Sequence, residues 1–304
     1  MAVSYPIGGK VVLVTGAARG IGAELSREAA RRGARVALVG LEPEELESVA
    51  AGCGPEAAWF EADVTDAEAI GAAVAGAVER FGGLDVVVAN AGIAADALLR
   101  YMEPAEFERT IDVNVIGSYR TIVAALPHVI EARGYVLQVA SAAAFLAVPR
   151  LGAYSASKAA AEAMCNCLRH EVGHHGVDVG VAYFSWIDTD LVAYGRDSGD
   201  AYAPLRRLNR GPLARTYPVS AAAEALIEGI ERRSRQIMMP RWLKVANLIR
   251  ALLPFAAAKP IRRVMPDVEA AVRAETEARG AEASMPVGPG GEAAMRAPRK
   301  APTA

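Results

Sequence analysis

Short, uninterrupted runs of apolar residues alternate with segments of helical periodicity over the first 240 positions of this chain. Continuous Val, Leu and Ala runs are typical of strands buried on both faces of a parallel sheet. Strand–helix repetition of this kind places helices on both sides of the sheet, so the sequence predicts an α/β fold with a doubly wound parallel sheet. The predicted strands are 10–15, 34–39, 57–61, 84–89, 134–140, 177–183 and 236–239, and the predicted helices are 20–32, 43–51, 66–81, 104–131, 153–172 and 220–233.

The pattern weakens after residue 189, which suggests the domain boundaries. Residues 190–217 mix Gly, Pro, Arg and Tyr and predict a long loop with room for one short helix. We expect a single catalytic domain over 1–240, followed by an apolar and basic C-terminal extension over 241–275. The Ala, Gly, Pro and Arg content of 276–304 predicts a disordered tail.

The composition excludes several classes of function. Of 304 residues 53% are hydrophobic, which is ample for a core, and a net charge of −2 gives no reason to expect a nucleic-acid partner. The cysteines, Cys53, Cys165 and Cys167, are too few and too poorly spaced for a disulfide or a metal site, so we expect no metal and a reducing compartment. Because the first predicted strand begins at Lys10, a secretory leader has no room, and the sequence predicts a cytoplasmic protein.

A glycine-rich turn, Thr15–Gly22, joins the first predicted strand to the first predicted helix. Glycines there permit a tight turn and a close approach of the backbone to a pyrophosphate, while the helix N-terminus supplies N–H donors. A glycine cluster at this junction of a parallel sheet predicts a dinucleotide site, and with it a Rossmann fold. The candidate cofactor-binding residues of the turn are Gly16, Ala18, Arg19, Gly20, Ile21 and Gly22.

Tyr154 and Lys158 lie four residues apart in the helix predicted over 153–172 and therefore share one face. A free tyrosine titrates near pH ~10, and a close ammonium group favours the phenolate and lowers that pKa. The pair is a candidate general acid/base. Taken alone, such a pair is more often an ordinary surface Tyr and Lys, and it is the other motifs of the chain that favour catalysis.

Together with the spacing Gly-x-x-x-Gly-x-Gly, the pair resembles the short-chain dehydrogenase/reductase family over about residues 8–240. The resemblance implies NAD(P)-dependent hydride transfer, with Tyr154 as acid/base and Lys158 lowering its pKa and reaching the nicotinamide ribose. Asn114 and Ser141 match the two other catalytic positions, the first holding a water near Lys158 and the second holding the substrate oxygen. The remaining cofactor positions that match are Asp63 and Val64 at the adenine, Asn90, Ala91 and Gly92 in support of the central sheet, and Ile187 and Thr189 at the nicotinamide.

Two stretches depart from the family pattern. Phe184-Ser185 stands where the family usually has Pro-Gly, so bulkier residues form the wall near the nicotinamide. At the end of the second strand the chain has Gly40-Leu41-Glu42 instead of an Asp for the ribose of NAD. The missing Asp removes a repulsion against a 2′-phosphate and Arg19 offers a cation, which favours NADP. The alternative is NAD, with Glu42 on the ribose.

The sequence thus predicts an NAD(P)-dependent oxidoreductase that interconverts an alcohol and a carbonyl compound. Few charges in 142–151 and an apolar extension indicate a hydrophobic substrate. The alternatives are a non-catalytic dinucleotide sensor, a lipid-surface protein on the same fold, or an isomerase or dehydratase that recycles its nicotinamide.

The sequence suggests two surfaces that could contact partners, one in segment 241–263 and one on the predicted helices at 104–131 and 153–172. Segment 241–263 is too short and too charged to span a bilayer, and packing or a protein interface is favoured over contact with a membrane surface. The family resemblance implies a homodimer or homotetramer through the helices at 104–131 and 153–172. Small residues that permit such close packing are Ala156, Ala159, Ala160 and Ala163.

Overall fold

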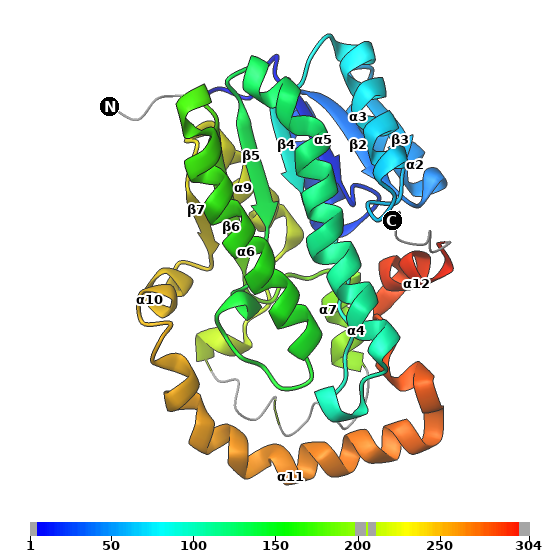
Figure 1. Cartoon of the computed structure of the whole chain (residues 1–304), viewed down its shortest axis with the longest axis vertical. Coiled ribbons are helices and arrows are strands. Elements are labelled where there is room, and N and C mark those ends of the chain that lie inside the picture. Colours follow the sequence, from blue (N-terminus) through cyan, green and yellow to red (C-terminus); the bar gives the residue numbers. More distant parts are fainter. Residues whose placement is uncertain (1–4, 198–204, 206–210, 298–304) are drawn as a thin grey trace.

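Seven parallel strands form one central sheet in the computed structural model, which describes residues 5–197, 205 and 211–297. The strand order is β3-β2-β1-β4-β5-β6-β7, so the direction of winding reverses between β1 and β4 (Figure 1). The predicted doubly wound α/β fold is confirmed. The strands are β1 (Val11–Thr15), β2 (Arg35–Gly40), β3 (Ala57–Glu61), β4 (Val86–Ala89), β5 (Tyr135–Val139), β6 (Asp178–Phe184) and β7 (Gln236–Met239).

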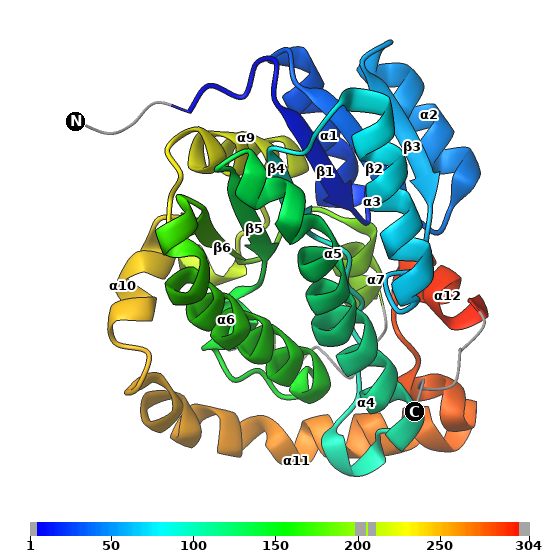
Figure 2. The ribbon, with the colours of Figure 1, turned by 45° about the horizontal axis from the view of Figure 1, so that its top comes forward.

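Helices cover both faces of the sheet and bury a separate hydrophobic core against each face (Figure 2). Val11 and Leu13 of β1 join one core, whereas Val12 and Val14 join the other, because successive strand residues point to opposite faces. This two-sided burial is the reason the strands show no polar alternation. One face carries α3 (Ala67–Phe81), α5 (Ser118–Glu131) and α6 (Gly152–Val172), and the other carries α1 (Gly20–Arg31), α2 (Pro43–Cys53) and α9 (Val219–Glu231).

The helix predicted over 104–131 is continuous but not uniform. It consists of α4 (Pro104–Ile111), a π-helical segment (Asp112–Gly117) and α5. A π-helical turn adds a residue to one turn and is frequent at functional sites. The whole stretch is long and apolar enough to cross a bilayer by length and composition. Val113 and Ile122 nevertheless lie in the core on the sheet, as in an ordinary buried helix.

Short helices and turns connect these elements. In the region predicted as a loop, α7 (Asp190–Asp197) follows β6, and residues 198–204 and 206–210 lie outside the described part of the chain. The described 3₁₀ turns are Leu99–Tyr101, Ala142–Ala144, Gly173–His175, Gly211–Ala214 and Gly280–Ser284.

The last part of the chain, residues 241–297, wraps around the carboxyl edge of the sheet, and we call it the C-terminal strap. It contains α10 (Trp242–Leu248), α11 (Leu253–Arg279) and α12 (Gly288–Arg296). Figure 1 shows α11 passing below α6 and α4 before the chain turns back to α12. The strap is held there by backbone bonds, since the Val287 amide donates to the Ala94 carbonyl over 3.0 Å.

The prediction of a disordered tail from residue 276 was therefore wrong for the described residues. Helix α11 continues to Arg279, and α12 packs against the domain with Gly288 and Gly291 buried. The Gly and Pro content suggested disorder, but residues of both types have structural roles in α12. Pro289 lies in the first turn of α12, where proline is tolerated, and Gly291 has no room for a side chain beside Pro286. Residues 298–304 lie outside the described part.

Two adjacent glycines of α12 offer a matched test of this docking. A Cβ at Gly291 would lie 2.7 Å from the Pro286 carbonyl oxygen, whereas one at Gly290 would meet only Arg19 Cδ at 3.7 Å. Both substitutions by Ala raise helix propensity by about 1 kcal/mol. We expect Gly291→Ala to speed amide hydrogen exchange over 287–296 by about tenfold, because the helix must shift, and Gly290→Ala to leave it unchanged or slower. Equal exchange in the two variants would contradict this docking.

Candidate active site

A cavity of about 770 Å³ opens at the carboxyl ends of the strands, beside the reversal point between β1 and β4. Ligands of open α/β sheets bind at this position. The cavity runs from Arg19 and Asp63 past Tyr154 to Trp242 and Ile261 of the strap. Among the predicted site residues, Ala18, Gly22 and Asn114 do not line the cavity. The predicted residues that do line it are Gly16, Arg19, Gly20, Ile21, Asp63, Val64, Asn90, Ala91, Gly92, Ser141, Tyr154, Lys158, Ile187 and Thr189.

The glycine-rich turn has the close packing that a dinucleotide site needs. Gly16 and Gly20 have φ values of +65° and +55°, which disfavour any residue with a Cβ. A Cβ at Gly22 would collide with the Gly16 carbonyl oxygen and the Asn90 side-chain amide. Ala18, which is part of the turn, is buried. The turn leads directly into α1, whose first N–H groups are available to a pyrophosphate.

Asn90 locks this turn to the sheet. Its side-chain amide donates to the Thr15 carbonyl over 2.9 Å and to the Gly16 carbonyl over 3.2 Å. The Thr15 hydroxyl in turn accepts from the backbone amides of Asn90 and Ala91. The structure therefore places Asn90 where a sheet-supporting role requires it.

Arg19 is held by acidic side chains at the edge of the cavity. Its Nε donates to Glu42 over 2.8 Å, and its other nitrogens lie 3.4 Å from Glu45 and 3.5 Å from Asp190. Burial works against the charged form, but the hydrogen bond and charge of Glu42 raise the pKa of Arg19 overall. The two residues that the sequence offered as alternative cofactor contacts are thus bonded to each other.

Next to Asp63, the predicted adenine contact, lies a buried arginine that the sequence analysis missed. Arg109 is 3% exposed and donates to Asp63 over 3.2 Å and to Thr65 Oγ1 over 3.1 Å. It also donates to the Ala294 carbonyl of α12, so it ties the predicted adenine contact to the strap. No local signal marks Arg109, because Glu106, Glu108 and Asp112 surround it in the sequence.

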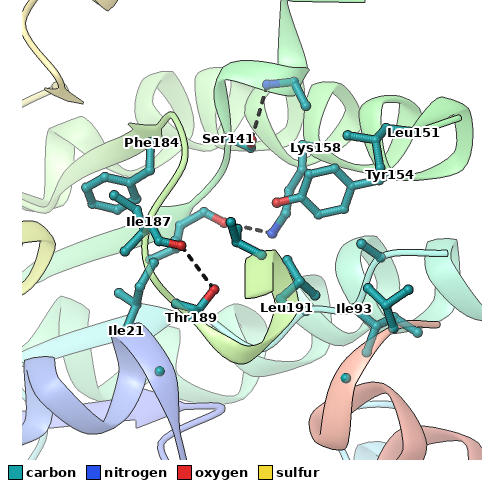
Figure 3. Close-up of a pocket in the computed structure, with 18 of the residues that line it drawn as sticks. Ile21, Ile93, Ser141, Leu151, Tyr154, Lys158, Phe184, Ile187, Thr189 and Leu191 are labelled. Carbon is teal, nitrogen blue, oxygen red and sulfur yellow. Dashed lines mark hydrogen bonds between the residues drawn. The ribbon is translucent and has the colours of Figure 1, made fainter. Parts of the chain in front are cut away.

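Tyr154 and Lys158 project from the same face of α6 into the cavity, as predicted (Figure 3). Lys158 Nζ lies 5.5 Å from the centre of the Tyr154 ring and donates to the Val139 carbonyl over 3.0 Å. Ser141, at the end of β5, faces the same space, and its hydroxyl accepts from the Ala143 amide over 3.2 Å. The structure therefore brings the phenol, the amine and the hydroxyl to one point.

Burial dominates the ionisation of the pair. It raises the pKa of Tyr154, and hydrogen bonding by Ser141 offsets this only in part. It lowers the pKa of Lys158 to about 8. The lowered tyrosine pKa expected from the neighbouring lysine is therefore not found in the free protein, because desolvation penalises both charged forms.

Asn114 lies in the π-helical segment and is completely buried. Its Oδ1 accepts from the Ile93 amide over 2.8 Å, and its Nδ2 donates to the Ile93 carbonyl over 2.8 Å and to Ser157 Oγ over 2.9 Å. A Cβ at Gly92 would lie 3.1 Å from Lys158 Nζ and 3.2 Å from Asn114 Oδ1. The geometry supports a positioning role for Asn114, and its predicted water contact stays a prediction.

The segment at the end of β6 closes the side of the cavity where the sequence predicts the nicotinamide. Phe184, Ser185 and Trp186 all line it, so the departure from Pro-Gly does alter this wall. The side chain of Thr189 stands opposite the glycine turn, with its Cγ2 3.5 Å from the position of a Cβ on Gly20. Its amide donates to the Ile187 carbonyl over 2.8 Å.

A second buried ion pair, also missed from the sequence, supports the substrate side. Arg150 donates to both carboxylate oxygens of Asp96, over 2.7 and 3.1 Å, and to Glu275 of α11 over 3.3 Å. Arg150 has a φ of +76°, in the left-handed region, and it ends the loop just before Tyr154. The strap is thereby bonded to the loop that positions the candidate acid/base.

The ionisation of Lys158 predicts how stability depends on pH. Between pH ~8 and ~10.5 the folded protein binds fewer protons at Lys158 than the unfolded chain, so its free energy of unfolding rises with pH. Without cofactor, we expect the wild type to gain about 2 kcal/mol relative to Lys158→Met between about pH 7 and about pH 9.5. Urea unfolding at both pH values measures this. Parallel pH profiles of the two proteins would show that Lys158 titrates normally.

The chain is similar in sequence to known dehydrogenases. The profile of the family described as "short chain dehydrogenase" matches residues 10–198. The chain is 32% identical over 254 residues to 11-beta-hydroxysteroid dehydrogenase 1A of Arabidopsis thaliana, which covers 81% of this chain and 72% of that protein.

Solved structures agree with these sequence matches. A dehydrogenase/reductase from Sinorhizobium meliloti 1021 superposes with a TM-score of 0.69 at 30% identity, over 78% of this chain and 96% of that one. A short chain dehydrogenase/reductase from Burkholderia phymatum, solved in complex with NAD, superposes with a TM-score of 0.72 over 83% of this chain and 96% of that one. The second shares 22% identity and supports the fold alone.

Proposed function

The chain belongs to the short-chain dehydrogenase/reductase family, and on this premise we propose that it interconverts a hydrophobic secondary alcohol and the corresponding ketone. The observation that carries the proposal is the convergence of Tyr154, Ser141 and Lys158 on one point of a largely apolar cavity. A substrate oxygen placed there reaches the two hydroxyl groups.

Each of the three side chains has a distinct task in this proposal. The Tyr154 hydroxyl donates a proton to the carbonyl oxygen during reduction and accepts it from the alcohol during oxidation. The Ser141 hydroxyl holds the same oxygen in place. Lys158, next to the Tyr154 ring, favours the phenolate whenever its own amine is charged.

The residues around the glycine turn fit a nicotinamide dinucleotide, which supplies or accepts the hydride when bound. The fit rests on the positive φ values of Gly16 and Gly20, on the absence of side-chain volume at Gly22, and on the free N-terminus of α1. Asp63 and Val64 border the adenine end of this cavity, and Ile187 and Thr189 border the other.

The walls beyond Tyr154 support a hydrophobic substrate. Beyond Ser141, the loop after β5 contributes only apolar side chains, and the strap contributes Trp242 and Ile261. A relative from Arabidopsis thaliana carries the name of a hydroxysteroid dehydrogenase, which supports a bulky ring system or a long-chain compound as the substrate class. The wall residues from the loop are Ala142, Ala143, Leu146, Ala147, Val148, Pro149 and Leu151.

For the cofactor we propose NAD, although the sequence favoured NADP. Arg19 was the residue expected to bind a 2′-phosphate, but its guanidinium already faces three carboxylates, Glu42, Glu45 and Asp190. A phosphate there would meet a surplus of negative charge, whereas a 2′-hydroxyl can donate to Glu42.

Charge removal at Glu42 tests this choice. We expect the wild type to bind NADH more tightly than NADPH, and Glu42→Gln to shift the ratio of the two dissociation constants toward NADPH by about tenfold, or about 1.4 kcal/mol. Calorimetric titration with both nucleotides measures the ratio, and Glu47→Gln on the exposed face of α2 is the control for the same change of charge. Tighter NADPH binding in the wild type that collapses in Arg19→Ala would return the assignment to NADP.

Oligomerisation and location are also part of the proposal. The π-helical segment and α5 carry exposed Ile116, Tyr119 and Val123, and the neighbouring α6 carries exposed Ala156 and Ala160. Apolar and small residues on two neighbouring helices support a homodimer or homotetramer through this surface. We propose that the protein works in the cytoplasm.

The test of the proposed reaction is Tyr154→Phe. We expect NAD-dependent oxidation of hydroxysteroids or long-chain secondary alcohols by the wild type, followed as reduced nicotinamide. Loss of the phenolic proton should lower kcat about 10²- to 10⁴-fold while the dissociation constant for NADH stays within about twofold. Turnover that needs only catalytic amounts of NAD would point to an isomerase or dehydratase, and full activity of Tyr154→Phe would exclude the assigned acid/base.

A further inference from the structure

We propose that the outer face of α10 and of the first turns of α11 docks the protein onto the surface of an anionic lipid bilayer. We call this surface, formed by residues 241–263, the docking face. The sequence favoured packing or a protein interface for this segment. Its exposure, its charge and its position against the catalytic cavity now argue for lipid. Delivery of substrate from the bilayer rests on the proposed function, whereas docking does not.

The apolar residues of the docking face are not buried by the protein. Val245, Leu248, Leu252 and Phe255 are 64%, 85%, 63% and 80% exposed. Val245 and Leu248 lie one turn apart on α10, Leu252 lies in the connection to α11, and Phe255 lies in the first turn of α11. Only Leu243 of α10 is buried. Internal packing therefore does not account for this run of large apolar side chains, and an external surface must cover it.

The charges of this segment all have one sign. From Arg241 to Pro266 the chain has six Arg or Lys and no Asp or Glu. Arg241 and Lys244 precede the exposed apolar residues, and Lys259, Arg262 and Arg263 follow them. Within the described part of the chain, no ion pair joins any of these five to an acidic side chain. Exposed apolar side chains flanked by basic residues are typical of segments that lie in the interface of an anionic membrane.

The sixth basic residue fixes the docking face to the catalytic domain. Arg250 binds both carboxylate oxygens of Glu162 on α6 and lies 5.4 Å from the centre of the Phe145 ring. The connection between α10 and α11 is thereby anchored to the helix that carries Tyr154 and Lys158. A bilayer bound at the docking face would consequently hold the active site at a defined distance.

The inner side of the same segment forms a wall of the catalytic cavity. Trp242, Ala257, Pro260 and Ile261 line that cavity, whereas Leu248 and Phe255 are exposed and are not among its lining residues. One short segment thus separates an apolar cavity from an apolar outer surface. For a substrate dissolved in lipid, this arrangement offers a route that avoids water.

A second copy of the chain fits the docking face less well than a bilayer does. In a two-fold contact the basic ends of one copy would face those of its partner and repel them. The segment has no acidic residues that could offset this repulsion. Exposed Tyr119 and Val123 of α5 already offer an apolar surface for self-association.

Co-sedimentation with vesicles tests the proposal on the full chain. We expect the wild type to sediment with phosphatidylcholine vesicles that contain phosphatidylglycerol, to stay soluble with phosphatidylcholine alone, and to be released by added salt. Leu248→Ser/Phe255→Ser and Lys259→Glu/Arg262→Glu should each weaken the partition at least tenfold. Arg27→Glu/Arg31→Glu on α1 makes the same charge change away from the docking face and should bind like the wild type.

Three results would overturn the proposal. The first is a wild type that remains in the supernatant with phosphatidylglycerol vesicles, and the second is a Leu248→Ser/Phe255→Ser variant that binds them normally. The third is a change of oligomeric state in that variant, measured by analytical ultracentrifugation without lipid, since this would assign the face to a second copy.

Activity separates docking from the proposed reaction. With a water-soluble alcohol we expect Leu248→Ser/Phe255→Ser to match the wild type, and with substrate presented in anionic vesicles we expect it to turn over at least tenfold more slowly. Vesicle binding without any NAD-dependent turnover would uphold the docking face and reject the reaction. Turnover of the soluble alcohol without vesicle binding would uphold the reaction and reject the docking face.

Discussion

The close approach of the chain to itself between β1 and β4 is the constraint on which the rest of the site depends. Gly22 has no space for a side chain against the Gly16 carbonyl, and the Asn90 amide holds the carbonyls of Thr15 and Gly16. The glycine turn, the start of α1 and the end of β4 therefore move as one unit. Without this contact the cavity would have no fixed edge on which to place a pyrophosphate.

Desolvation is the second governing effect, and it acts on the catalytic pair. Burial raises the pKa of Tyr154 and lowers that of Lys158 to about 8, so the free site disfavours charge on either group. In a cavity with few competing waters, interactions with a developing charge are stronger than at a surface. Asn114 and Gly92 contribute by positioning, since the first fixes the Ile93 backbone and the second leaves room for the Lys158 amine.

The C-terminal strap links regions that other parts of the fold keep apart. Arg109 joins it to Asp63, the predicted adenine contact, and Arg150 joins it to the loop before Tyr154. At its beginning, Arg250 joins it to Glu162 on α6. Three buried or half-buried arginines thus attach one segment to both ends of the cavity. Its inner side becomes a wall of the active site, while its outer side remains apolar and basic.

The sequence by itself determined the sheet, the glycine turn and the shared helix face of Tyr154 and Lys158, because local patterns encode them, and the family resemblance pointed to Ser141. A continuous apolar run specifies a buried strand, strand ends of a parallel sheet meet at one edge, and residues four apart share a helix face. Only the tertiary structure decided the fold of α12, the Arg109 contact to Ala294 and the pairing of Arg150 with Asp96 and Glu275. Those contacts join residues 54 to 185 positions apart, and no local periodicity records such partners. The tertiary structure also decided the direction in which the pKa of Tyr154 shifts, because burial depends on the folded surroundings and not on the four-residue spacing.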